Sequence, residues 1–251
     1  MQPLDQNTNL IVTHRPWLDL VLYVLVFVVF FVVSIAVSSL RIQDGHIRLL
    51  TALVCNVSVI GGGALLVNAK RKTFDPRSVG LWPIHIDWTW ILIALGIAFV
   101  LLPLRVILAV IAAQLFEGGM ASVQRRSDLL LGGTSFNALT ALMNLIGVGV
   151  LAPIAEELLF RGGVLTFMRS RIALWPAALS SGALFALGHA DSAAVVASSF
   201  VIGVANAWLF EKSKSLWTPI IVHIVNNTAA VLLLQFVLLQ KPFLSAATAT
   251  G

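Results

Sequence analysis

The stretch NALTALMNLIGVGVLAPIAEELLFRGGVLTFM, residues 137–168, decides the fold, because it is long and apolar enough to cross a lipid bilayer as one helix. A helix rises about 1.5 Å per residue, so about 20 residues cross roughly 30 Å of hydrocarbon. The same stretch contains two adjacent glutamates, Glu156 and Glu157, and an arginine, Arg161. Ionisable side chains at membrane depth cost about 2.5–3.5 kcal/mol each, so we expect these three to serve a function.

The rest of the chain has the composition of an integral membrane protein. Its 251 residues are 59% hydrophobic and 11% charged, and the mean hydropathy is +0.95. These features predict an all-α fold, a polytopic transmembrane helix bundle of about seven to eight spans that forms a single transmembrane domain over residues 1–251. The predicted spans are 17–40, 49–69, 88–112, 137–168, 174–190, 193–210 and 216–238.

The charges and the cysteine count exclude several classes of protein. The first sixteen residues lack the pattern of a removable signal peptide, and the lone Cys55 allows neither an internal disulfide nor a cysteine-based zinc site. The basic residues lie in short loops between spans, so we expect no nucleic-acid partner.

Ten basic residues are expected on the side of the N-terminus and five on the opposite side, which predicts a cytoplasmic N-terminus. The ten are Arg15, Lys70, Arg71, Lys72, Arg77, Arg161, Arg169, Arg171, Lys212 and Lys214; the five are Arg41, Arg48, Arg125, Arg126 and Lys241.

Helical periodicity separates the two glutamates. Glu157 and Arg161 are four residues apart and share a face, so we interpret them as a structural ion pair. Glu156 is rotated by about 100° from its neighbour and has no partner in its own helix. One carboxylate is thus free for chemistry while the other pairs.

Polar side chains in the fifth and seventh spans lie at a similar depth to Glu156. On the seventh span His223 and Asn227 are four residues apart and share a face, and His189 ends the fifth span. At 1.5 Å per residue all four lie about 13–22 Å from the N-terminal face, so they can meet in one layer.

That depth requires the fourth helix to continue to about residue 170. Gly162 and Gly163 must then stay helical, although each glycine costs about 0.8–1 kcal/mol relative to alanine.

Three motifs in order resemble a known family. Glu156 to Arg161 reads EExxxR, Phe185 to His189 reads FxxxH, and His223 to Asn227 reads HxxxN. The connecting segment FVIGVANAWLFEKSKSLWTPI, residues 200–220, is also similar. Together they resemble the CPBP family of intramembrane proteases, also called the Abi or CAAX-protease family, whose eukaryotic branch includes the Ras-converting CAAX endopeptidase. The resemblance covers a catalytic core of about residues 137–230.

The resemblance implies a helix bundle that encloses a polar, water-accessible chamber within the membrane. In such an enzyme Glu156 is the general base that activates a water for peptide hydrolysis. His189, His223 and Asn227 then stabilise the oxyanion or hold a metal, and Glu157 with Arg161 supports the site. The implied activity is that of a CAAX prenyl protease-like intramembrane endopeptidase. Its implied partners are membrane lipid and a lipidated or membrane-anchored peptide, of which a prenylated CAAX tail is one form.

The residues leave the question of a metal open. His189, His223 and Glu156 form an acceptable ligand set for one divalent ion such as zinc, whereas asparagine suits an oxyanion better than zinc. The chain has no serine in a GxSG setting and no HExxH motif, so attack by activated water is the simpler form of hydrolysis. A metalloprotease and a metal-free glutamate mechanism both remain possible interpretations.

Two other functions compete with proteolysis. A non-proteolytic member of the same family could act in bacteriocin immunity or regulation, and a proton-coupled transporter could use glutamate and histidine as a relay. In a transporter, Glu156→Gln would abolish proton flux, whereas in a protease it would abolish cleavage.

Overall fold

The computed structural model describes residues 16–71, 81, 87–116, 127–128, 130–131, 136–190 and 192–249, and every regular element in these ranges is a helix. Segments labelled η are π-helical turns that continue a neighbouring α-helix. The elements are α1 (Pro16–Ser39), α2 (Gly45–Val57), η1 (Ser58–Gly62), α3 (Gly63–Arg71), α4 (Trp88–Phe116), α6 (Ala138–Ile146), η2 (Gly147–Leu151), α7 (Ala152–Glu157), η3 (Leu158–Leu165), α8 (Thr166–Arg169), α9 (Leu174–Leu187), α10 (Ala193–Ser213) and α11 (Trp217–Ala249).

All seven predicted segments are helical, which confirms the all-α membrane bundle. Six helices in the described part of the chain are long and apolar enough to cross a membrane, counting α2 to α3 and α6 to α8 as continuous rods. The fifth predicted span is the exception in length, because α9 has only 14 residues. At 1.5 Å per residue it rises about 21 Å, less than the hydrocarbon thickness.

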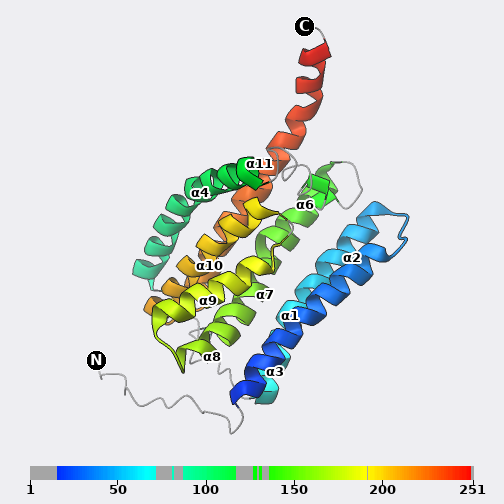
Figure 1. Cartoon of the computed structure of the whole chain (residues 1–251). Coiled ribbons are helices and arrows are strands. Elements are labelled where there is room, and N and C mark those ends of the chain that lie inside the picture. The colour runs from blue at the N-terminus through cyan, green and yellow to red at the C-terminus, as the bar shows by residue number, and fades with distance from the viewer. Residues whose placement is uncertain are drawn as a thin grey trace.

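The rod from α6 to α8 lies between two groups of helices (Figure 1). On one side α1 and the α2 to α3 rod form a hairpin that contacts η2, α7 and η3. On the other side α9, α10 and α11 contact the same rod, and α4 packs on α10 and α11. The central rod therefore carries the two glutamates to where both groups meet.

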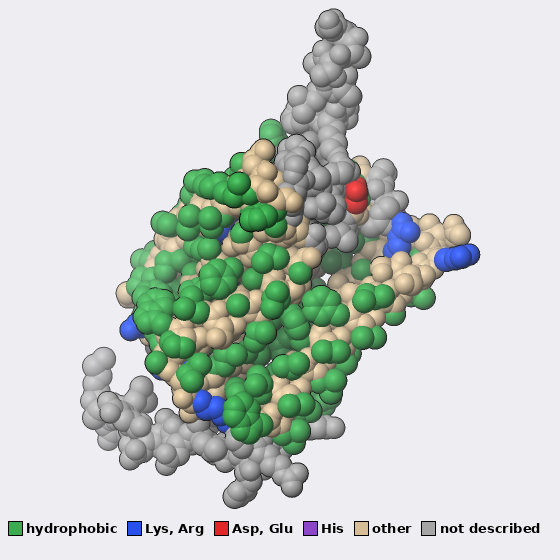
Figure 2. All heavy atoms as spheres, in the orientation of Figure 1, with side chains coloured by type: hydrophobic (Ala, Val, Ile, Leu, Met, Phe, Trp, Pro, Cys, Tyr) green, Lys and Arg blue, Asp and Glu red, His purple; other side chains and the backbone are tan. Residues whose placement is uncertain are grey.

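The outer surface is apolar, as a bilayer requires. Hydrophobic side chains cover most of the face shown in Figure 2, and Lys and Arg side chains appear mainly near its edges. In α4, Leu92 and Phe99 are 67% and 71% exposed. Side chains so exposed would be unfavourable in water but are solvated by lipid tails.

Glycines allow two close helix contacts that position the site. A Cβ on Gly203 of α10 would lie 2.9 Å from the Cα of Gly182 in α9, and one on Gly163 of η3 would lie 2.5 Å from Cε1 of Tyr23 in α1. Small residues at such crossings let helix backbones approach closely within a membrane. Gly162 and Gly163 are both helical, so the predicted continuation of the fourth helix to Arg169 is confirmed.

Candidate active site

The two glutamates lie in a short α-helical segment between two π-helical turns. Glu156 and Glu157 end α7, with η2 before it and η3 after it. A π-helical turn is wider than an α-helical one, which displaces backbone carbonyls from the regular hydrogen-bond ladder. Side chains bind two of these carbonyls: Thr166 Oγ1 donates to the Arg161 carbonyl at 2.8 Å, and Asn227 Nδ2 donates to the Val148 carbonyl at 3.2 Å.

Glu157 and Arg161 form the ion pair that the sequence predicts. Arg161 Nε lies 3.0 Å from Glu157 Oε2, Arg161 Nη1 donates to Oε1 at 3.1 Å, and both side chains are fully buried. Only the Nη1 contact is a hydrogen bond; Nε and Oε2 have no hydrogen-bond partner among the described residues, so their 3.0 Å approach is a contact between opposite charges. The remaining guanidinium nitrogen, Nη2, donates to the backbone carbonyl of Gly203 at 2.7 Å. The charge pair is therefore anchored to α10 as well as within its own rod.

The same carboxylate also orients one of the histidines. Glu157 Oε1 accepts a hydrogen bond from Asn206 Nδ2 at 2.9 Å and lies 2.7 Å from His223 Nδ1. An ionised carboxylate can only accept, so His223 Nδ1 carries the hydrogen of this bond. The opposite nitrogen, His223 Nε2, then points away from Glu157.

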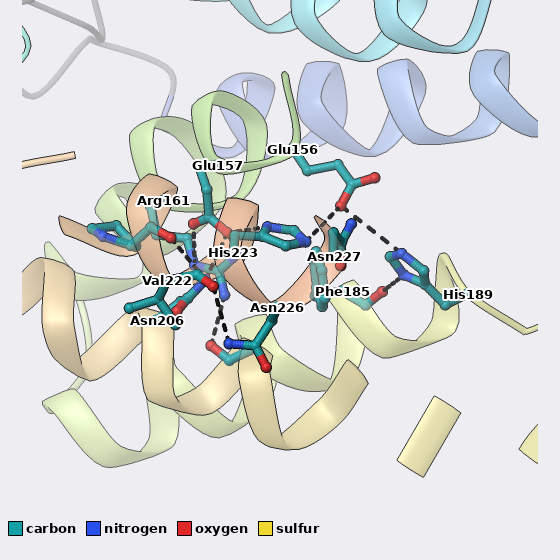
Figure 3. Close-up of polar contacts among 12 residues, drawn as sticks. Glu156, Glu157, Arg161, Phe185, His189, Asn206, Val222, His223, Asn226 and Asn227 are labelled. Carbon is teal, nitrogen blue, oxygen red and sulfur yellow. Dashed lines mark hydrogen bonds and ion pairs between the residues drawn. The ribbon is translucent and has the colours of Figure 1, made fainter. Parts of the chain in front are cut away.

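Glu156 faces both histidines (Figure 3). Its Oε2 atom lies 3.6 Å from His223 Nε2 and 3.9 Å from His189 Nε2, and the side chain is 12% exposed. Both distances exceed that of a hydrogen bond, and within the described residues this buried oxygen has no hydrogen-bond partner. The structure thus brings Glu156, His189 and His223 together, three of the four side chains expected to meet.

The hydrogen-bond partners of the two histidines determine which ring nitrogen of each carries the hydrogen. His189 Nδ1 lies 3.0 Å from the carbonyl oxygen of Phe185, which can only accept, so Nδ1 carries the hydrogen there too. In their neutral forms both imidazoles therefore direct an Nε2 lone pair at Glu156 Oε2. A water, an added proton or a cation between Glu156 Oε2 and these nitrogens would supply the positive charge or hydrogen that acceptor atoms bind.

Phe185 holds the two rings in place. Its ring centroid lies 4.7 Å from that of His189 and 5.4 Å from that of His223, and the side chain is 1% exposed. The phenylalanine of the FxxxH motif thus packs against both imidazoles, and its carbonyl sets the tautomer of one of them.

Asn227 is placed differently from the three residues around Glu156 Oε2. Its position on α11 is four residues after His223, as the sequence predicts, but its amide nitrogen donates to Val148 in η2. The described geometry thus joins three of the four predicted catalytic side chains at one oxygen. The fourth joins α11 to the π-helical turn that precedes Glu156.

Sequence reasoning missed two groups on α10. Asn206 is fully buried and donates to Glu157, and the carbonyl of Gly203 accepts from Arg161. A buried amide in an otherwise apolar span is the same kind of signal that singled out the histidines, so Asn206 could have been found. A backbone carbonyl leaves no such mark in the sequence.

The site suits a metal in the kinds of its ligands but not in their spacing. Two imidazole nitrogens whose opposite nitrogens are held by a carboxylate or a carbonyl form a common arrangement around zinc. No group of three His, Cys, Asp or Glu side chains among the described residues has the spacing of a metal site. At these separations the side chains do not form a metal site.

Comparisons with known proteins agree with the motifs. Residues 138–229 match the family model described as Type II CAAX prenyl endopeptidase Rce1-like. An Escherichia coli protein described as an uncharacterized 24.3 kDa protein is 30% identical over 95 residues, which cover 36% of this chain and 44% of that protein. The Bacillus subtilis (strain 168) protein YdiL, described as a candidate membrane peptidase, is 29% identical over 84 residues, 34% of each chain.

The chain therefore spans less than half the length of either curated relative that it matches. No solved structure is significantly similar to it. The matched region includes all three motifs, and the resemblance predicted from them is confirmed.

Proposed function

Because residues 138–229 belong to the Rce1-like family of CAAX prenyl endopeptidases, we propose that this membrane protein is an intramembrane endopeptidase whose Glu156 activates the attacking water. The proposal rests mainly on one observation. A buried oxygen of Glu156, without a hydrogen-bond partner among the described residues, faces Nε2 atoms of His223 and His189 at 3.6 and 3.9 Å. A water between them would donate to the carboxylate, which is the contact that a general base needs.

In the proposed reaction, Glu156 takes one proton from the water. The water oxygen bonds to the carbonyl carbon of the scissile peptide, and the carbonyl oxygen becomes an oxyanion. An imidazole of His189 or His223 that has taken up a second proton presents an Nε2–H to that oxyanion, and Asn227 can contribute its amide. Glu156 then returns its proton to the leaving nitrogen as the C–N bond breaks.

Glu157 and Arg161 have a supporting role in this proposal. The carboxylate of Glu157 keeps the hydrogen of His223 on Nδ1 and stabilises the ring when it is doubly protonated. Arg161 in turn fixes the orientation of this carboxylate. If a divalent ion binds, His189, His223 and Glu156 would hold it, and the ion would lower the pKa of its bound water.

The proposed substrate is a lipidated or membrane-anchored peptide, including a prenylated CAAX-type tail, because the site lies within membrane-spanning helices. We place the protein in a membrane with its N-terminus on the cytoplasmic side, following the distribution of Lys and Arg along the chain.

Purified protein in detergent, incubated with matched prenylated and unprenylated peptides with and without a chelator, tests the proposal. We expect cleavage by the parent and a rate lower by about 10²–10⁴-fold in Glu156→Gln, since a general base contributes an effect of that size. Asp44→Asn is the matched control, because it makes the same carboxylate-to-amide change at an exposed helix cap and should cleave like the parent. Loss of cleavage with chelator would favour the metal form of the mechanism.

Absence of cleavage of every peptide, with Glu156→Gln indistinguishable from the parent, would contradict the proposal. It would favour a non-proteolytic role in immunity or regulation. Proton flux in proteoliposomes that Glu156→Gln abolishes, without any cleavage, would instead indicate a transporter.

A further inference from the structure

Asn206 of α10 lies at the junction of the buried ion pair and the helix that carries His223. Its side chain is fully buried, and Nδ2 donates to Glu157 Oε1 at 2.9 Å and to the carbonyl oxygen of Pro219 at 3.3 Å. An amide nitrogen carries two hydrogens, so both are used. The two acceptors also fix the orientation of the amide, because its oxygen in the same place would face a carboxylate and a carbonyl.

The contact with Pro219 reaches the helical turn of His223. In an α-helix the carbonyl of residue 219 belongs to the turn that closes at residue 223. One side chain therefore joins the carboxylate of Glu157 to the backbone turn from which His223 projects. The 2.7 Å contact between His223 Nδ1 and Glu157 Oε1 depends on these two elements keeping their relative position.

The face of α10 that meets the ion pair matches it in polarity. Gly203 offers a carbonyl to the cationic Arg161, and one turn later Asn206 donates one N–H to the anionic Glu157. Gly203 also packs directly on Gly182 of α9, which holds α10 close to the neighbouring helix. The donor and the acceptor on α10 are thus presented from a closely packed crossing.

The amide is costly at this position, which argues for a specific role. Asn206 Oδ1 is buried without a hydrogen-bond partner in the described part of the chain. An apolar side chain of similar size, such as leucine, would avoid that unpaired oxygen among the surrounding hydrophobic residues. The cost is offset only by the two hydrogen bonds that Nδ2 makes.

We propose that Asn206 is a positioning residue, which holds Glu157 against the turn of His223 so that His223 Nε2 faces Glu156. This inference rests on the proposed function, since it concerns the same site. Without the amide, Glu157 Oε1 keeps only the contacts from Arg161 and His223. The imidazole is then free to rotate or shift relative to Glu156, and small displacements of catalytic groups lower the turnover rate more than they lower substrate affinity.

The test compares the parent with Asn206→Leu by two measurements. One is the kinetics of peptide cleavage; the other is NMR of protein labelled with ¹⁵N at its five histidines, with the His223 ring signals assigned by their loss in His223→Gln. We expect kcat to fall on the order of tenfold with KM within about twofold, and the ring signals of His223 to move. Ser198→Ala is the control, because Ser198 is a buried polar residue of α10 whose hydroxyl, among the described residues, donates to the Val195 carbonyl of the same helix at 3.1 Å.

Unchanged His223 signals in Asn206→Leu would overturn the inference, and so would moved signals with an unchanged kcat. If Asn206→Leu does not fold, Asn206→Ser provides the same comparison, since its short hydroxyl cannot reach both acceptors. A parent that cleaves no peptide would count against the proposed function alone. In that case the NMR comparison still decides whether Asn206 holds His223 in place.

Discussion

Helices α1 and α10 differ in how their hydropathy relates to their burial. The span Trp17–Ser39 of α1 has a mean hydropathy of 3.2 and only 17% of its most apolar window is buried, whereas the span Ala193–Ser213 of α10 has a mean hydropathy of 1.8 and 44% is buried. In water the more apolar helix would be the more buried one. In a bilayer lipid tails solvate the apolar helix, and the bundle interior collects the small and polar residues. The less hydrophobic span is therefore the one that supports the site.

Breaking the buried ion pair should give the largest loss of stability. We expect Arg161→Met to lower the free energy of unfolding by about 3–5 kcal/mol, because it leaves the buried charge of Glu157 without the cation that balances it. Val24→Ala on the outer face of α1 should change it by only about 0.5 kcal/mol or less, since Val24 is 45% exposed. Equilibrium unfolding in mixed micelles measures both. The double variant Glu157→Gln/Arg161→Met should recover part of the loss, and its failure to do so would count against a charge effect.

The contact between α1 and the central rod should give an intermediate effect. We expect Gly163→Ala to cost about 1–3 kcal/mol, because the added Cβ would lie 2.5 Å from Cε1 of the buried Tyr23. Gly96→Ala in α4 is the matched control, since a Cβ there meets nothing within 4 Å. It should stabilise its helix by about 0.5–1 kcal/mol. Thermal unfolding of the two variants should therefore shift in opposite directions, and equal shifts would show that α1 does not depend on this contact.

The smallest effect is expected at the exposed turn between α1 and α2. Asp44 caps α2, and its hydrogen bond from the Ile47 amide, followed by that from His46, holds the pKa of the carboxyl below its ordinary value of 3.8. The pKa is lower in the folded form, so the charged cap stabilises the protein above about pH 4, and this contribution is lost as the pH falls through the folded-state pKa. Melting temperatures between pH 5 and pH 3 should fall slightly more for the parent than for Asp44→Asn, whose amide oxygen caps without titrating. Parallel curves would contradict this assignment.

Much of the fold could be predicted because membrane helices leave a strong pattern in the sequence. The predicted spans 17–40, 88–112 and 193–210 correspond to helices Pro16–Ser39, Trp88–Phe116 and Ala193–Ser213. The short length of α9 was less visible, since hydropathy alone does not mark where the hydrogen-bond ladder ends. The π-helical turns were not predicted either. One of them, η2, accepts a hydrogen bond from Asn227 of α11, a contact between helices that hydropathy does not reveal.

For the candidate site, too, some contacts could be predicted from the sequence and others could not. Spacing within one helix predicted the pair of Glu157 with Arg161 and separated Glu156 from it. Spacing could not predict that His223 would lie between the two glutamates, with Nδ1 on Glu157 and Nε2 toward Glu156. It also could not predict that Asn206 would bind Glu157, because that contact joins residues 49 positions apart.

From the sequence alone come the membrane-spanning helices, the face of each helix on which a polar side chain lies, and the motifs by which residues 138–229 match the Rce1-like family model. These follow from hydropathy and from a periodicity of 3.6 residues, which are properties of a single helix. Only the tertiary structure decides which atoms of different helices meet. Their relative rotation and distance are set by close contacts such as Gly182 with Gly203 and Gly163 with Tyr23, where the shapes of two surfaces, rather than the pattern of either one, determine the fit.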